Sequence, residues 1–188
     1  MTKTGIVGKD VDMLDHFEKV KGEARYCGDI KLPGMLVGKL LYSPYPCARI
    51  NSIDITKAQA IPDVVAIMLH TDVPGENSYF HYIGDQPLLV SDMVRYQGDA
   101  VAAVAARTET AADLALEAIE VAYESVEGIF DPEEAMKPGA RQVWPDRDNV
   151  FKRLVLEEGD VETGFDKADV IVEGTYQTPF IEPAFLEP

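Results

Sequence analysis

Residues 94–127 constrain the possible fold more than any other stretch, because they predict a strand, a helix and a second strand in close succession. Residues 100–106, which follow the Gly98-Asp99 turn, consist only of alanine and valine, an apolar run of strand length. Thr108 then offers a hydroxyl that can cap the first turn of a helix. Behind it, apolar residues recur at the spacing i, i+3, i+4 and i+7, which is one face of an amphipathic helix: Ala111, Leu114, Ala115 and Ala118.

The predicted helix leads into a second strand, in which Ile119, Val121 and Tyr123 alternate with polar or small residues. Such alternation is typical of a strand with one buried face and one solvated face. The three segments together predict a compact βαβ unit. Periodicity alone explains this unit as part of the core, without any further role.

The rest of the chain predicts shorter elements around this unit. Strands are expected at residues 24–30, 35–42, 49–55, 64–69, 150–156 and 170–178. Short helices are expected at residues 57–60, with Thr56 as a cap, at residues 131–134, with Pro132 in the first turn, and at residues 160–168. Strands interspersed with short helices, and only one clear βαβ unit, predict an α+β fold rather than a doubly wound sheet.

The charge of the chain excludes several classes of partner. Thirty-three acidic residues against 17 basic ones give a net charge of −16. Such a surface repels phosphate backbones and anionic membranes, so we expect neither nucleic acid nor a membrane as a partner. No apolar run approaches the roughly 20 residues of a membrane span.

The N-terminal sequence and the cysteines predict the cellular compartment. Residues 1–14 contain no apolar core of a signal peptide. The only cysteines, Cys27 and Cys47, lack CxxC spacing; they could pair, but the sequence favours two reduced thiols in the core. Both features predict a cytoplasmic protein.

The local motifs of common active sites are absent from the sequence. It contains no phosphate-binding loop, no dinucleotide-binding glycine pattern and no nucleophile elbow. The three histidines, His16, His70 and His81, are far apart and lack neighbours at metal-ligand spacing. The aromatic residues of segment 79–83 could stack on a ligand, but packing explains them better. The sequence therefore predicts no catalytic, cofactor-binding or metal-ligating residue.

Five segments, in this order, resemble the large, molybdenum-binding subunit of the xanthine dehydrogenase and aldehyde oxidase family. The first is residues 19–36, which resemble the opening of that subunit. SPYPCARI at residues 43–50 resembles the family's S-P-[YH]-x-H-A-R-I, and VRYQGD at residues 94–99 resembles V-R-Y-x-G-[EDQ]. GDVETGFDKAD at residues 159–169 resembles G-D-V-x-x-[AG]-F-x-x-A-D, and residues 173–188 resemble E-G-x-Y…L-E-P. The order and spacing of the segments make the match specific.

This resemblance implies a domain organisation and a fold. It implies an α/β-hammerhead domain, with a mixed sheet, at residues 23–172. Residues 1–22 are polar and acidic with few apolar positions, a composition that predicts an arm or an irregular lead-in. Residues 173–188 would begin the first molybdopterin-binding domain.

The resemblance also implies an activity and its cofactors. The family hydroxylates heterocycles or aldehydes at a molybdopterin-bound molybdenum, and passes electrons to [2Fe–2S] clusters and FAD on other subunits or domains. Its catalytic glutamate and pterin-binding loops lie downstream of the hammerhead. The resemblance therefore implies no cofactor on this chain, and partners that carry the molybdopterin, iron–sulfur and FAD sites.

Three positions depart from the family pattern. Cys47 and Pro183 stand where histidines are usual, and Ala100 stands where a proline is usual. These departures leave the subfamily and the substrate open. Two other interpretations of the chain also stay open: a freestanding interaction or small-ligand-binding module, and a truncated remnant without function.

Overall fold

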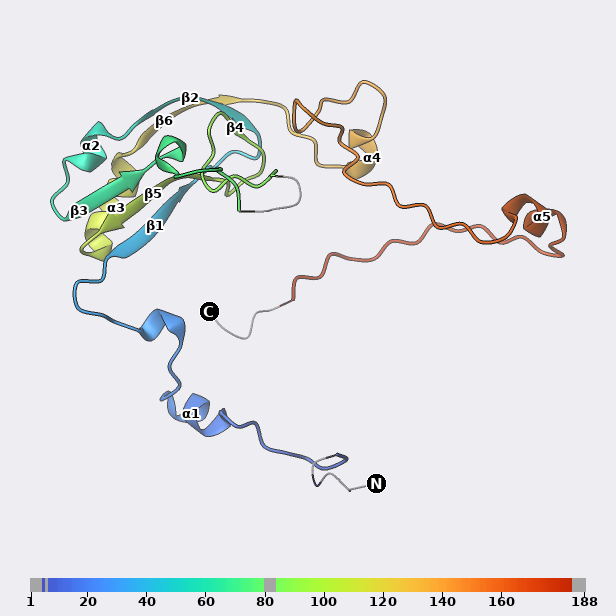
Figure 1. Ribbon diagram of the computed structural model, residues 1–188, viewed down its shortest axis with the longest axis horizontal. Coiled ribbons are helices and arrows are strands. Elements are labelled where there is room, and N and C mark those ends of the chain that lie inside the picture. The colour runs from blue at the N-terminus through green and yellow to red at the C-terminus, as the bar shows by residue number, and fades with distance from the viewer. Residues whose placement is uncertain (1–4, 6, 80–83, 184–188) are drawn as a thin grey trace. The chain divides into compact units, whose positions relative to one another are not determined.

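The computed structural model describes residue 5, residues 7–79 and residues 84–183 (Figure 1). The chain divides into two compact units, residues 34–158 and a second unit of residues 1–33 with 159–188. Among the described residues, no helix is both long enough and apolar enough to cross a bilayer.

The unit of residues 34–158 contains two three-stranded antiparallel sheets. The first has the order β1-β5-β3, formed by β1 (Val37–Tyr42), β5 (Ala100–Ala106) and β3 (Val64–Met68). The second has the order β4-β2-β6, formed by β4 (Met93–Val94), β2 (Ala48–Asp54) and β6 (Glu120–Ser125). The described residues of this unit also form the helices α2 (Thr56–Gln59), η2 (His70–Asp72), α3 (Glu109–Ala118) and α4 (Pro132–Ala135).

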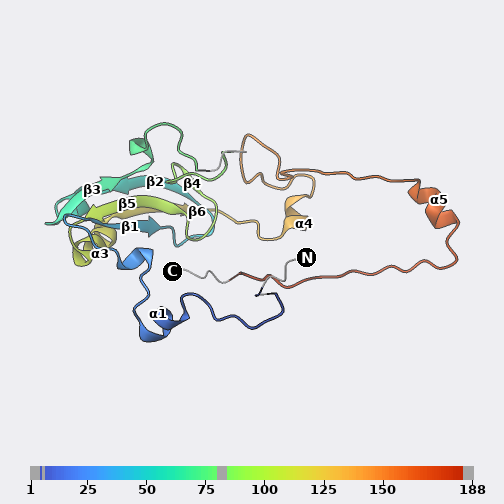
Figure 2. The ribbon, with the colours of Figure 1, turned by 60° about the horizontal axis from the view of Figure 1, so that its bottom comes forward.

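The core lies where α3 packs on the first sheet (Figure 2). It is built mainly from alanine, and its members are Ala58, Ala102, Val104, Ala106, Ala111, Ala112, Ala115 and Ile119. Because these side chains are small, helix and strand can approach closely, which maximises van der Waals contact. Ile53 of β2 and Val121 of β6 pack against the same cluster, which therefore contacts both sheets. A second, smaller cluster of Ala48, Val90 and Val94 packs with Ile50 and Tyr123 of the second sheet.

The predicted fold class is confirmed, and so is the strand–helix–strand order of residues 100–125. The arrangement of the two strands differs from the predicted mixed sheet with a βαβ unit, because β5 and β6 belong to different sheets and all pairings are antiparallel. The reason is that β1 and β3 occupy both edges of β5, so β6 must pair elsewhere, and it pairs with β2.

The N-terminus of α3 is confirmed at Thr108, whose hydroxyl accepts a hydrogen bond from the Ala111 amide at 3.1 Å. The buried face of the helix is rotated from the predicted one. Leu114 is 49% exposed, whereas Ala112 is fully buried. Successive residues turn by about 100° around a helix, and the buried face centres on Ala112 and Ala115, which leaves Leu114 at the side.

At the start of two short helices of this unit, an aspartate carboxylate accepts backbone amides. The carboxylate of Asp131 accepts the Glu133 and Glu134 amides at the start of α4. The N-cap of α2 is Ile55, which makes no side-chain capping bond, and the predicted cap Thr56 is the first residue of the helix. The Thr56 amide donates to Asp54 Oδ1 at 2.9 Å. The carboxylate is a stronger acceptor for an amide than the hydroxyl.

Three predicted strands are wrong. Residues 24–30 contain the 3₁₀ turn η1 (Cys27–Asp29), and residues 150–156 and 170–178 are irregular. A strand needs a hydrogen-bonding neighbour, and within the described ranges no other strand pairs with these segments. Their apolar, β-branched composition predicted the strands without specifying such a partner.

In the second unit, the part that the sequence predicted to be irregular contains α1 (His16–Lys21). Gly22 ends this helix with a left-handed φ of 71°, a conformation in which glycine has no side-chain clash. The helix α5 (Val161–Asp166) confirms the third predicted short helix, and Asp160 caps it by accepting the Thr163 amide at 3.1 Å.

Replacement of Thr108 by alanine should lower the free energy of unfolding by about 1 kcal/mol, because the Ala111 amide loses its capping acceptor. Urea unfolding followed by circular dichroism measures the change. Thr110→Ala is the matched control, since Thr110 is an exposed residue inside α3, where alanine is the better helix former. Equal destabilisation of the two variants would contradict the capping role.

Candidate functional site

The segments 43–50 and 94–99, which carry two of the family-like motifs, lie against each other. The Ser43 amide donates to the Asp99 carbonyl at 2.8 Å, and the Gly98 amide donates to the Ser43 carbonyl at 3.0 Å. Both Ser43 and Asp99 are 2% exposed. The Ser43 hydroxyl contacts the backbone of Tyr45, whose ring packs on that of Tyr123 at 5.1 Å between centroids.

Asp99 is a carboxylate in a buried position at the end of this turn. Its Oδ2 accepts the backbone amide of Arg95 at 3.1 Å. Burial nevertheless raises the pKa of Asp99 above its ordinary value of 3.8, because the charged form loses hydration, and this hydrogen bond compensates only in part. Burial also raises the pKa of the neighbouring Tyr96 hydroxyl.

Arg95 connects this turn to the C-terminal part of the same unit. Its Nη1 donates to the Met93 carbonyl at 2.9 Å, and its Nε donates to the Val143 carbonyl at 3.2 Å. The guanidinium lies 3.5 Å from the centre of the Trp144 ring, and that of Arg147 lies 5.4 Å from the same ring. Burial lowers the pKa of Arg95, and nearby carboxylates oppose that shift. Two cations therefore contact the only tryptophan of the chain.

Segment 128–151 has little regular structure and is held by polar side chains. Asn149 donates to the carbonyls of Ala135 and Arg141, at 3.0 and 2.9 Å, and accepts the Val143 amide at 2.9 Å. Arg141 donates to the Glu127 carbonyl at 2.8 Å and to the Cys47 sulfur at 3.4 Å. Side-chain amides and guanidiniums thus replace the backbone pairing that a strand or helix would provide.

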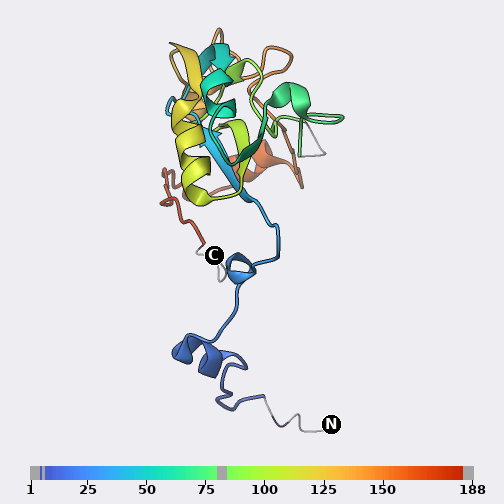
Figure 3. The same cartoon turned by 90° about the vertical axis from the view of Figure 1, so that its left-hand side faces the viewer.

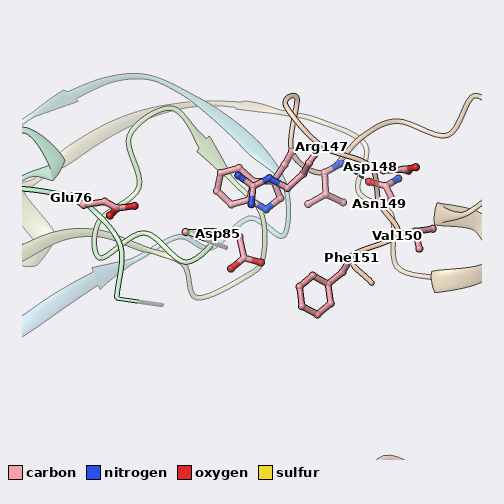
Figure 4. Close-up of a pocket in the computed structure, with 10 residues that line it drawn as sticks. Glu76, Asp85, Arg147, Asp148, Asn149, Val150 and Phe151 are labelled. Atoms are coloured by element: carbon pink, nitrogen blue, oxygen red, sulfur yellow. Dashed lines mark hydrogen bonds between the residues drawn. The ribbon is translucent and has the colours of Figure 1, made fainter. Parts of the chain in front are cut away.

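An open cleft of about 720 Å³ lies beside Trp144 (Figure 4). Its walls combine acidic, basic and aromatic side chains, among them Glu76, Asp85, Trp144, Arg147 and Phe151. A second hollow, of about 390 Å³, is lined by Cys47, Tyr96, Phe130 and both Arg95 and Arg141. Each hollow could accommodate a flat or charged small molecule or a side chain of another protein surface.

No set of three or more histidine, cysteine or carboxylate side chains in the described part of the chain is arranged to hold a metal ion. The two cysteines do not pair. Cys47 is buried, as predicted, whereas the prediction of a buried position is wrong for Cys27, which lies exposed on the 3₁₀ turn η1. His81 and most of the predicted aromatic segment 79–83 lie outside the described residues; Tyr79, its first member, is 56% exposed.

The sequence matches a known family. A sequence profile described as "Aldehyde oxidase and xanthine dehydrogenase, a/b hammerhead domain" matches residues 21–127, more than half of the chain. The chain belongs to this family. The match includes both strands that flank α3 and the two segments that meet at Ser43 and Asp99.

Two relatives show how much of a larger protein the chain corresponds to. A probable subunit of xanthine dehydrogenase from Bacillus subtilis is 47% identical over 169 residues, which cover 90% of this chain and 23% of that protein. The "Nicotinate dehydrogenase large molybdopterin subunit" from Eubacterium barkeri is 40% identical, over 97% of this chain and 43% of that one. The chain therefore spans less than half the length of these curated relatives.

Solved structures agree with the fold. The aldehyde oxidoreductase from Desulfovibrio desulfuricans superposes with a TM-score of 0.77 at 27% identity, over 87% of this chain and 19% of that chain. The aldehyde oxidoreductase from Desulfovibrio gigas superposes with a TM-score of 0.74 at 26% identity, over 84% and 19% of the two chains.

Sequence reasoning located the Ser43 and Asp99 segments but not the residues that anchor segment 128–151. Arg141 and Asn149 belong to no motif, and their roles depend on carbonyl groups distant in sequence. The one available signal was Trp144, because a single tryptophan in an aperiodic stretch needs a packing partner.

Replacement of Arg95 by lysine should shift the fluorescence emission of Trp144 to longer wavelength and cost about 1–2 kcal/mol of stability, because lysine cannot bind two carbonyls and cover the ring at once. Trp144 is the only tryptophan, so the emission reports on the surroundings of this ring. Arg107→Lys is the control, since Arg107 is exposed and its backbone contact to Asp63 is retained. An unchanged spectrum for Arg95→Lys would contradict the anchoring role.

The raised pKa of Asp99 predicts a pH dependence that an asparagine should remove. Because the pKa of the folded state lies above that of the unfolded state, the contribution of Asp99 is fully present below about pH 3.8 and is lost as pH rises through the folded-state pKa. The stability of the wild type relative to Asp99→Asn should therefore fall over that window and then level off. Urea unfolding of both proteins between about pH 3.5 and 7 tests this; a difference that stays constant or grows with pH would refute it.

Proposed function

We propose that this chain forms the N-terminal structural part of the large subunit of a molybdenum hydroxylase. The complete enzyme would hydroxylate a heterocycle or an aldehyde at a molybdopterin centre that lies outside this chain. The observation that carries the proposal is the family match of residues 21–127, together with much longer relatives whose names refer to xanthine dehydrogenase and to a molybdopterin subunit.

The residues of this chain do not fit the cofactors of such an enzyme. A [2Fe–2S] cluster takes four cysteine ligands, and the chain has two, one buried and one exposed. No described group of side chains is suited to a metal. Molybdopterin, [2Fe–2S] clusters and FAD would therefore be held by further domains or partner subunits, and no chemical step is assigned to the residues of this chain.

The role of this chain in that enzyme would be to shape the surroundings of the molybdenum centre. The turn at residues 96–99 and the segment 79–83 are proposed to line part of the substrate channel. The proposed boundaries are an arm at residues 1–22, the hammerhead at residues 23–172 and the start of the next domain at residues 173–188. The cytoplasmic location stays a prediction.

A freestanding binding module is the second candidate function, and the open cleft beside Trp144 favours it. Acidic and basic groups around an aromatic ring could bind a zwitterionic or heteroaromatic molecule. Titration of the 188-residue chain with heteroaromatic carboxylates, followed by Trp144 fluorescence, tests this alternative. Saturable binding that Arg147→Ala abolishes would support it.

The 188-residue chain, purified from cells that make molybdopterin, should contain molybdenum far below one atom per chain and should not oxidise xanthine, nicotinate or aldehydes. Metal analysis by mass spectrometry and dye-reduction assays measure both. The longer subunit that contains this sequence, purified in the same way, is the positive control and should carry molybdenum. Stoichiometric molybdenum in the 188-residue chain would refute the proposal.

A further inference from the structure

Within the described residues, the helices that contact the β1-β5-β3 sheet, α3 and α2, pack against the core cluster on one of its faces (Figure 3). On the covered face, Leu41 pairs with Ala102 and Lys39 pairs with Val104, all below α3. Side chains alternate across a strand, so the intervening residues point to the other side. We call this other side the bare face; it comprises Gly38 and Leu40 of β1, Ala103 and Ala105 of β5, and Ala66 and Met68 of β3. We include Tyr42, which follows a register shift after Leu41, because its side chain is exposed like that of Leu40.

The bare face is apolar and exposed. Leu40 is 40% exposed, Tyr42 54% and Met68 41%. Apart from the hydroxyl of Tyr42, no polar side chain occurs on it. The middle strand β5 reads AVAAVAA, without the polar alternation that a strand with one solvated face shows. Such a continuous apolar run is typical of a strand that is buried on both faces.

The shape of the bare face is a shallow trench along β5. Leu40 and Met68 lie on either side of Ala103, and the next row consists only of the small residues Gly38, Ala105 and Ala66. The outer strands are two strand spacings apart, about 10 Å, which is close to the diameter of an α-helix. The covered face of β5 receives α3 in the same way, on a row of small side chains.

We propose that the bare face is the docking site of an amphipathic helix from the part of the enzyme that carries the molybdopterin domains. This inference rests on the proposed function, in which most of the enzyme lies outside this chain. The helix would place large apolar side chains, such as leucine or phenylalanine, on the alanine floor of the trench. Leu40, Tyr42 and Met68 would pack along its flanks.

A second copy of this chain is the poorer occupant. Three strands of about five residues give the bare face an area on the order of 250 Å². A stable protein–protein interface needs about 800 Å² on each partner. Packing between domains of one assembled protein does not need this minimum area, because the helix belongs to a chain that is already held nearby.

Cysteine labelling tests whether the bare face is covered. Leu40→Cys, in a Cys27→Ser background that removes the exposed thiol, should react readily with a maleimide in the 188-residue chain. In the complete large subunit, the reaction should slow at least about tenfold. Leu114→Cys is the matched control, because Leu114 is 49% exposed but lies on α3, away from the bare face; it should react equally in both proteins. Equally fast labelling of Leu40→Cys in both proteins would overturn the proposal.

The same samples separate this inference from the proposed function. The molybdenum content of the complete protein tests the proposed function, whereas labelling of Leu40→Cys tests the docking site. The occupant is identified by a photo-crosslinking phenylalanine analogue at position 42 of the complete protein, followed by peptide mass spectrometry. A crosslink to a helical peptide outside residues 1–188 is expected. A crosslink to β1 or β3 of a second copy, or to an extended strand, would overturn the helix-docking proposal.

Discussion

The close contact between α3 and β5 is the interaction on which the unit of residues 34–158 depends. Ala111, Ala112 and Ala115 meet Ala102 and Ala106 in the buried core, and only small side chains allow a helix and a strand to approach this closely. Residues of the second sheet pack on the same cluster, and this sheet also has a smaller buried cluster of its own. Because alanine contributes little apolar area, packing on the other face of β5 would add substantially to the stability of this small core.

Polar side chains hold the C-terminal part of this unit in place. Segment 128–151 buries few large side chains and is anchored by Arg95, Arg141 and Asn149, each of which binds backbone carbonyls. The same part of the chain shapes the two hollows beside Trp144 and Cys47. A segment fixed by polar contacts keeps its position without a large apolar core.

Features that depend on interactions between residues close in sequence were predicted correctly, whereas features that depend on distant contacts were not. Local signals predicted β1, β2, β3, β5, α3 and β6 to within about two residues, and the cap at Thr108, because caps and periodicity act within one turn or strand. The same signals failed for residues 150–156 and 170–178, where β-branched residues occur without a described strand to pair with. The anchors Arg141 and Asn149 were missed since their partners lie elsewhere in the chain.

The sequence by itself determined the strands β1, β2, β3, β5 and β6, the helix α3 and, through five ordered segments, the family, because these depend on residue types at short spacings. It also determined that β5 is apolar on both faces. Only the tertiary structure decided that β5 and β6 belong to different sheets, which face of α3 is buried, and that the carboxylate of Asp99 lies buried on the Arg95 amide. Those outcomes depend on competition for strand edges and on contacts between elements, and no local pattern records them.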